Sequence, residues 1–198
     1  MMRDEQNQTA KSFVEQVVGL APALAGARAD GLERFAKAGL PTTRVEAWKF
    51  TNLRGLDKLT MGSAPDAATV TVDAIPTALD TPAPRLVFVA GQYRADLSRV
   101  GDLPDGVVLA ASTGDATPVA GEGPFRALNS ALSSQGAALR VAAGVKLASP
   151  VELVFIAATT GDKAALWNPR ITIDIADGAE ATVVEHHEIG RASCRERV

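Results

Sequence analysis

The chain has very few of the side chains that proteins use for redox, metal and nucleophilic chemistry. Its 198 residues include a single cysteine, Cys194, and only two histidines, His186 and His187. A single cysteine excludes a disulfide within the chain and a metal site made of several cysteines. With two adjacent histidines and no Gly-x-Ser-x-Gly motif, a Ser-His-Asp triad has little support. We therefore find no catalytic residues and expect no enzyme activity.

Long apolar runs and nucleotide-binding motifs are also missing. No stretch of about 18 apolar residues is present, which excludes a transmembrane helix. No Gly-x-x-x-x-Gly-Lys-Ser/Thr loop occurs, so the chain has no nucleotide-binding P-loop of its own. The amino terminus is too polar and too acidic for a signal peptide or a transit peptide. We expect a cytoplasmic protein with no membrane contact.

Basic residues are slightly outnumbered by acidic ones, 20 against 23, which gives a net charge of −3. Nucleic-acid binders usually carry a basic face, and the one dense basic cluster is Arg191, Arg195 and Arg197. The alternating pattern of the preceding strand stops there, so residues 191–198 are interpreted as a non-native tail from adapter or vector sequence. We therefore expect no nucleic-acid partner and assign no role to Cys194.

The amino-terminal part has the periodicity of helices. Apolar side chains over residues 10–26 form one stripe, and a second helix is expected over residues 29–38 with Phe35 on its buried side. Gly39 and Pro41 are typical of the end of that helix, because glycine tolerates a left-handed backbone and proline prevents continuation.

The segment Gly39–Leu53 holds the densest group of aromatic and charged side chains. Thr43 and Glu46 have the spacing of a capping box, which predicts a short helix. Trp48 and Phe50 are expected to anchor a small core, with the stem of Lys49 over an aromatic face. The alternative is that Trp48, Lys49 and Phe50 form a partner-binding surface.

Beyond this segment the composition changes twice. Residues 60–84, rich in alanine, threonine and proline, predict a linker with a short strand over residues 69–72. The apolar pattern then takes a period of two, beginning with a hairpin over residues 85–97. The further expected elements are a strand over 107–111, a helix over 124–132, and strands over Leu139–Val141, Val145–Leu147, Val151–Ile156, Ile171–Ile175 and Ala181–Glu185.

These last strands are short, and the corners between them contain Gly144, Pro150 and the pair Asp177-Gly178. Such corners suit the rungs of a parallel β-helix, in which each rung covers the apolar face of the one before. A small β-sandwich would give a similar pattern, so the pattern alone leaves both architectures open.

One cluster contains the residue types of metal ligands, Glu185-His186-His187-Glu188. On a strand, His186 and Glu188 face one side while Glu185 and His187 face the other. Two ligands per side are fewer than the three or four that a firm metal site needs. We interpret the cluster as a polar strand face, with a metal site as the alternative.

Four segments in the same order resemble the SufB/SufD family of iron–sulfur cluster assembly proteins, and its SufD members in particular. The first carries the family signature through Arg44, Glu46, Trp48 and Lys49, with Phe50 in place of the usual tyrosine. The others are the hairpin Leu86–Tyr93, the helix Phe125–Leu132 and the rung Asp177–His186.

The resemblance implies an α+β fold, in which a small helical amino-terminal domain leads into a right-handed parallel β-helix that is truncated here after its first rungs. The expected boundaries are a helical region over 1–59, a linker over 60–84, the start of the β-helix over 85–190 and the tail over 191–198. A β-helix cut within the stack would expose a strand edge, so marginal stability or aggregation is expected.

The resemblance further implies a non-catalytic scaffold subunit of the SUF system. In the full-length protein its partners would be a SufB-like paralogue and a SufC-like ATPase, and the iron–sulfur cluster would be assembled on the full complex. The family's proposed cluster histidine lies beyond residue 190, so no cofactor or metal ligand is assigned to this chain. The alternatives are a β-rich binding module with an unrelated ligand, and a metal-dependent enzyme that uses His186, His187 and nearby carboxylates.

Overall fold

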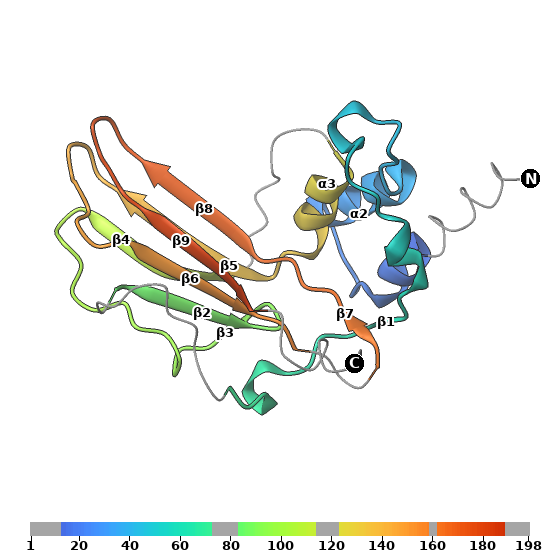
Figure 1. Ribbon diagram of the computed structural model, residues 1–198, viewed down its shortest axis with the longest axis horizontal. Coiled ribbons are helices and arrows are strands. Elements are labelled where there is room, and N and C mark those ends of the chain that lie inside the picture. The colour runs from blue at the N-terminus through green and yellow to red at the C-terminus, as the bar shows by residue number, and fades with distance from the viewer. Residues whose placement is uncertain (1–12, 73–82, 114–122, 159–161, 189–198) are drawn as a thin grey trace, which may run out of the picture. The chain divides into compact units, whose positions relative to one another are not determined.

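The computed structural model describes residues 13–72, 83–113, 123–158 and 162–188 (Figure 1). The chain divides into two compact units, each made of three segments. The helical unit contains Met1–Ser63, Asp115–Ser133 and Thr159–Asn168, and the strand unit contains Ala64–Gly114, Ser134–Ala158 and Pro169–Val198. The boundaries expected at residues 59, 84 and 190 stay a prediction.

The helical unit is built from helices and short turns around one apolar core. Residues 13–20 are helical, and they are followed by α2 (Ala27–Ala38), η1 (Glu46–Trp48), η2 (Arg54–Lys58) and α3 (Pro124–Leu132). A short parallel pair joins β1 (Met61–Gly62) to β7 (Ala164–Ala165). The core side chains are Phe13, Val14, Val17, Phe35, Met61, Ala127 and Leu128.

Two glycines determine how α2 ends and how closely it approaches α3. Gly39 has a φ of 66° and donates its backbone N–H to the carbonyl oxygen of Phe35, which confirms the expected helix end. A Cβ at Gly31 would lie 3.0 Å from the carbonyl oxygen of Ala127, so only glycine allows this distance without a shift. The expected helices over residues 29–38 and 124–132 are confirmed, and that over 10–26 is helical over residues 13–20.

Two local predictions from the sequence are wrong. The capping box does not form, because Val45 is the residue that precedes η1 and no side chain caps that turn. The strand expected over residues 69–72 is absent from the described structure. Instead, η3 (Ala67–Thr69) forms, because the carboxylate of Asp66 accepts a hydrogen bond from the backbone N–H of Ala68. Residues 73–82 of the expected linker lie outside the described residues.

The strand unit contains two sheets of parallel and antiparallel strands (Figure 1). One sheet has the order β3-β2-β6-β9 and the other has the order β4-β5-β8. The bounds are β2 (Arg85–Val89), β3 (Gln92–Tyr93), β4 (Val107–Thr113), β5 (Gln135–Val141), β6 (Val151–Ile156), β8 (Arg170–Ile175) and β9 (Val183–Glu188). The expected hairpin is confirmed, with Phe88 opposite Tyr93.

Two successive strand–corner–strand segments stack on each other within this unit. We call β5 with β6 the first coil, and β8 with β9 the second coil. Gly136 to Val141 pair in parallel with Arg170 to Ile175, and Val151 to Ile156 pair in parallel with Val183 to Glu188. The corners stack as well, since Lys146 forms a parallel bridge with Glu180. The strand expected over residues 145–147 is thus reduced to one bridged residue.

The α+β composition expected from the sequence is confirmed, but the expected β-helix is not seen in the part of the chain that the structure describes. Among the described residues the strands form separate sheets, and none of these sheets closes into a β-helix. One reason is that β4 joins β5 in antiparallel orientation, with Val107 opposite Val141, so the strand before the first coil does not form a coil of its own.

The most deeply buried part of the strand unit is the pair β2 and β6, in which every residue is buried. On one side of these strands, Val87, Val89, Val154 and Ile156 form a core with Ala67. On the other side, the rings of Phe88 and Phe155 stack with their centroids 5.4 Å apart. Strands with both faces buried read as continuous apolar runs, and Leu86–Val89 and Leu153–Ile156 have that pattern.

Candidate functional site

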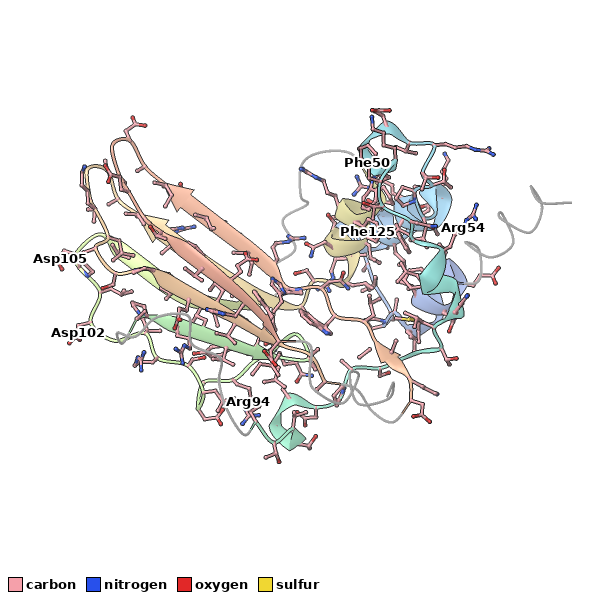
Figure 2. The ribbon with its side chains drawn as sticks, viewed as in Figure 1. Phe50, Arg54, Arg94, Asp102, Asp105 and Phe125 are labelled. Carbon is pink, nitrogen blue, oxygen red and sulfur yellow. The ribbon has the colours of Figure 1, made fainter. Side chains whose placement is uncertain are left out.

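The signature segment lies on an exposed loop of the helical unit. Figure 2 labels Phe50, from this loop, and Phe125, from α3. Trp48 is half-buried and its ring packs against Phe125 with centroids 5.2 Å apart. Phe50 is 93% exposed, so the prediction that it anchors a core is wrong. The loop therefore holds one aromatic ring against the core and presents the next aromatic ring to solvent.

A charged side chain lies over the exposed ring. Lys49 forms an ion pair with Glu46, and its Nζ atom lies 5.1 Å from the centroid of the Phe50 ring. This distance is within the range of a cation–π contact. Arg44 is exposed, and its backbone N–H donates to the hydroxyl oxygen of Thr42. The five signature residues thus lie in and beside η1, and their role stays a prediction.

The histidine cluster lies on β9, and its side chains alternate as expected. His187 stacks on Phe155 with ring centroids 5.0 Å apart, and its Nε2 atom lies 3.2 Å from the carboxylate of Glu185. His186 lies toward the opposite side, where its Nε2 atom is 3.6 Å from Oε1 of Glu152. Within the described ranges, no group of three histidine, cysteine or acidic side chains could hold a metal ion.

A buried charge cluster that sequence analysis missed lies across three neighbouring strands. Glu152 on β6 is 0% exposed, and its Oε2 atom accepts hydrogen bonds from Nε and Nη2 of Arg85 at 2.8 and 2.6 Å. Its Oε1 atom and the Nε2 atom of His186 are buried, and neither has a hydrogen-bond partner among the described residues. We call Arg85, Glu152 and His186 the buried triad.

The buried triad has no local sequence motif, because its members come from β2, β6 and β9. The available signal was one charged residue at the start of each apolar run, Arg85 before Leu86 and Glu152 after Val151. Charged residues are rarely buried unless they are paired. The sequence therefore suggests that each of these two residues has a partner, but the pairing of the strands must be known to identify it. Parallel pairing places Arg85 directly opposite Glu152.

A second guanidinium, that of Arg94, joins parts of the strand unit (Figure 2). Its Nη1 atom donates to the carbonyl oxygens of Ala67 and Val70 at 2.7 and 3.1 Å, and its Nε and Nη2 atoms donate to Asp96. The hydrogen bond from Arg94 lowers the pKa of Asp96, and the same bond raises the pKa of Arg94. This arrangement fastens η3 to the hairpin and contains no group poised for catalysis.

Two further findings concern the class of the protein. In the part of the chain that the structure describes, no helix is both long and apolar enough to cross a membrane. No protein-family model matches the chain.

Comparison with curated proteins gives similarity to iron–sulfur cluster assembly proteins of the SufB/SufD class. The chain is 33% identical over 161 residues to the iron–sulfur cluster assembly protein SufD of Escherichia coli (strain K12), which covers 78% of this chain and 37% of that protein. It is 28% identical over 177 residues to an iron–sulfur cluster assembly SufBD family protein of Synechocystis sp., which covers 80% of this chain and 38% of that protein.

The resemblance inferred from the four sequence segments is therefore confirmed. The chain matches 37–38% of the length of these two relatives.

Proposed function

We propose that this chain is part of a SufD-type scaffold subunit that takes part in iron–sulfur cluster assembly. The observation that carries the proposal is the similarity to SufD of Escherichia coli over 78% of the chain. The geometry supports a scaffold because the histidine cluster divides between two sides of β9, and the triad carboxylate is already bound by Arg85. A buried carboxylate that is held by a guanidinium is poorly placed to act as a general acid or base.

The stacked coils support the finer proposal that the strand unit is the beginning of a parallel β-helix. Each coil contributes one strand to each of the two sheets. The corners of the two coils pair as well, through the bridge between Lys146 and Glu180. In a β-helix such coils are added one on another, and each new coil covers the apolar side chains of the last. The exposed isoleucines of β8, Ile173 and Ile175, are the side chains that a further coil would cover.

The proposed partners are a SufB-like paralogue and a SufC-like ATPase, and the signature loop is the proposed contact surface in the helical unit. An exposed aromatic ring next to a lysine offers apolar area together with a cation, which are the features of an interface anchor. Val45, which precedes the turn, is also exposed and adds apolar area to the same loop.

Copurification tests this proposal. The full reading frame of the gene would be expressed with the SufB-like and SufC-like proteins of the same organism, with an affinity tag on this subunit. We expect all three proteins to elute together, and the purified complex to accept iron and sulfide as its substrates in a reconstitution reaction. Elution of the tagged subunit alone, at concentrations where a SufB-like and a SufC-like protein are abundant, would contradict the proposal.

A matched pair of variants tests the contact surface separately. Phe50→Ala removes the exposed ring of the signature loop, and Val108→Ala removes another exposed apolar side chain, from β4. We expect Phe50→Ala to weaken partner retention by about tenfold or more, as for an interface anchor, while Val108→Ala leaves it unchanged. Equal retention of both variants would leave the scaffold proposal standing and remove the signature loop from it.

A metal-dependent enzyme remains the competing hypothesis for β9. Metal analysis of a variant with both His186→Ala and His187→Ala tests it directly. Under the scaffold proposal, the purified chain and this variant carry the same small amount of zinc and iron. Stoichiometric metal in the unchanged chain that disappears in the variant would favour the enzyme.

A further inference from the structure

The helical unit contains a stretch whose charge is opposite in sign to that of the whole chain. Between residues 34 and 58 the sequence has six basic and two acidic residues, whereas the chain as a whole has 20 basic and 23 acidic residues. We call residues 34–58 the basic segment. Its cations, all of them exposed, are Arg34, Lys37, Arg44, Lys49, Arg54 and Lys58. A local excess of positive charge attracts negatively charged partners to that part of the surface.

Two arginines of the basic segment have a fixed backbone and an available guanidinium group. The backbone N–H of Arg44 donates to the hydroxyl oxygen of Thr42 at 3.3 Å, and that of Arg54 donates to Oδ1 of Asn52 at 3.0 Å. Short polar turns of this kind hold the backbone in place. Neither guanidinium group forms an ion pair with any residue that the structure describes. Each arginine therefore has its side-chain N–H donors available to a ligand outside the chain.

We propose that the basic segment binds an acidic segment of a partner protein, whose carboxylates pair with Arg44 and Arg54 and whose apolar side chains pack on Phe50. The inference rests on the proposed function, in which the signature loop is a contact surface, and it adds the chemistry of the surface that the loop contacts. Carboxylates suit guanidinium groups, because the planar group can donate two parallel hydrogen bonds to them.

The apolar side chains of the segment favour a folded or folding protein chain as the ligand. Phe50 lies between Arg44 and Arg54 in the sequence and is 93% exposed, and Val45 is 48% exposed. Figure 2 labels Phe50 and Arg54, which both belong to the helical unit. Aromatic rings and arginines are enriched at the centres of protein–protein interfaces, where their apolar area is covered by the partner.

A carboxylate within the segment disfavours a nucleic acid or a lipid surface. The side chain of Glu46 is 84% exposed and forms an ion pair with Lys49. A phosphate backbone or an anionic lipid layer presents negative charge without interruption, so it would bring phosphate groups against Glu46. A protein segment can place carboxylates opposite Arg44 and Arg54 and leave the position opposite Glu46 uncharged. The mixed charge therefore fits a partner with separate acidic side chains.

Site-specific cross-linking in the purified complex identifies the surface that faces Phe50. A photoreactive phenylalanine analogue would replace Phe50 in the full-length subunit, which is purified with its SufB-like and SufC-like partners and irradiated. The control carries the same analogue in place of Val108, an exposed residue of β4. We expect position 50 to cross-link to a partner segment in which acidic residues outnumber basic ones, and position 108 not to cross-link to that segment. A cross-link from position 50 to a segment without this acidic excess, or no cross-link in an intact complex, would overturn the inference.

A matched pair of double variants tests the role of charge. Arg44→Gln with Arg54→Gln removes two cations from the basic segment, and Arg140→Gln with Lys163→Gln removes two exposed cations elsewhere. We expect the first variant to bind the cross-linked partner about tenfold more weakly at low salt, and the difference to disappear at high salt, where exposed charges are screened. The second variant should bind as the unchanged subunit does. Equal binding by both variants at low salt would overturn the inference.

Two further probes test the competing ligands on the 198-residue chain. Flotation with vesicles of phosphatidylcholine and phosphatidylglycerol measures binding to a lipid surface, and titration with fluorescent single-stranded RNA measures binding to a nucleic acid. We expect neither probe to distinguish the unchanged chain from the variant with Arg44→Gln and Arg54→Gln. Binding that this variant abolishes would overturn the inference in favour of that ligand. Copurification of the three proteins is read separately, so the inference can fail while the scaffold proposal stands.

Discussion

The two coils of the strand unit pair residue for residue, yet they differ sharply in burial. Leu139 in the first coil is 3% exposed, whereas its partner Ile173 in the second coil is 48% exposed. The same holds for Val141 at 2% and its partner Ile175 at 40%. Since all four side chains are aliphatic, the difference comes from their positions in the stack and not from their chemistry.

The comparison shows what one more covering layer contributes to a coil. The strands of the first coil have hydrogen-bonded neighbours on both edges, because β5 lies between β4 and β8, and β6 lies between β2 and β9. The strands of the second coil are at the ends of their sheets in the described structure. Repeat architectures gain much of their stability from such interfaces between neighbours, and this predicts a weaker second coil.

The largest expected loss of stability comes from a substitution in the buried triad, which joins the first coil to the second. Arg85→Ala leaves the carboxylate of Glu152 buried without its cation, and removal of one partner from a buried pair typically costs about 3–5 kcal/mol. The matched control is the exposed ion pair that joins the two corners, between Lys146 and Glu180. Lys146→Ala should cost less than about 1 kcal/mol. Urea unfolding of both variants measures the two losses, and similar losses would contradict the assignment of a buried charge.

The next largest effect compares alanine substitutions at two residues that pair across the coils, Leu139 and Ile173. Leu139→Ala removes a buried side chain from the first coil, which should lower the free energy of unfolding by about 2–5 kcal/mol. Ile173→Ala removes a half-exposed side chain of similar size from the second coil, so its cost should be about 1 kcal/mol. Denaturant unfolding monitored by circular dichroism gives both values. A loss at Ile173 as large as that at Leu139 would mean that the second coil is covered in solution.

A third change separates the two coils without removing apolar area. A Cβ at Gly136 would collide with the backbone of Arg170, its partner in β8. We therefore expect Gly136→Ala to displace β8 and to lower the free energy of unfolding by about 1–3 kcal/mol. If β8 is displaced in this way, hydrogen exchange measurements should show faster exchange of the backbone amides in β8 but not in β4. Uniformly faster exchange in both strands would indicate a global loss instead.

The smallest expected effect lies outside the coils, at Asp96 in the hairpin region. Because the hydrogen bond from Arg94 lowers the pKa of Asp96, its contribution to stability is present above the ordinary titration range of aspartate and is lost as the pH falls through the lowered value. A small decrease in the urea midpoint is expected on acidification, and Asp96→Asn should reduce that decrease. The variant and the unchanged chain would respond identically if Asp96 were unpaired in solution.

Local features were the most predictable from the sequence. The helix end at Gly39, the helix over residues 124–132 and the hairpin were predictable because each depends on neighbouring residues. Phe50 was misassigned because its pattern is that of a core residue, whereas whether a ring at a turn points inward depends on what packs there. Trp48 contacts Phe125, and Phe50 is exposed. The triad required knowledge of parallel pairing between strands that are far apart in the sequence.

Engineered disulfides test the central claim, the parallel pairing of the two coils, most directly. In a chain with Cys194→Ser, one variant would carry Ala138→Cys with Thr172→Cys, and a second Arg140→Cys with Asp174→Cys, which are register partners in parallel strands. A third would carry Ala138→Cys with Asp174→Cys, which would be partners only if the strands ran antiparallel. Our account predicts that mild oxidation cross-links the first two variants and leaves the third reduced. Cross-linking of the third variant, with the first two remaining reduced, would contradict it.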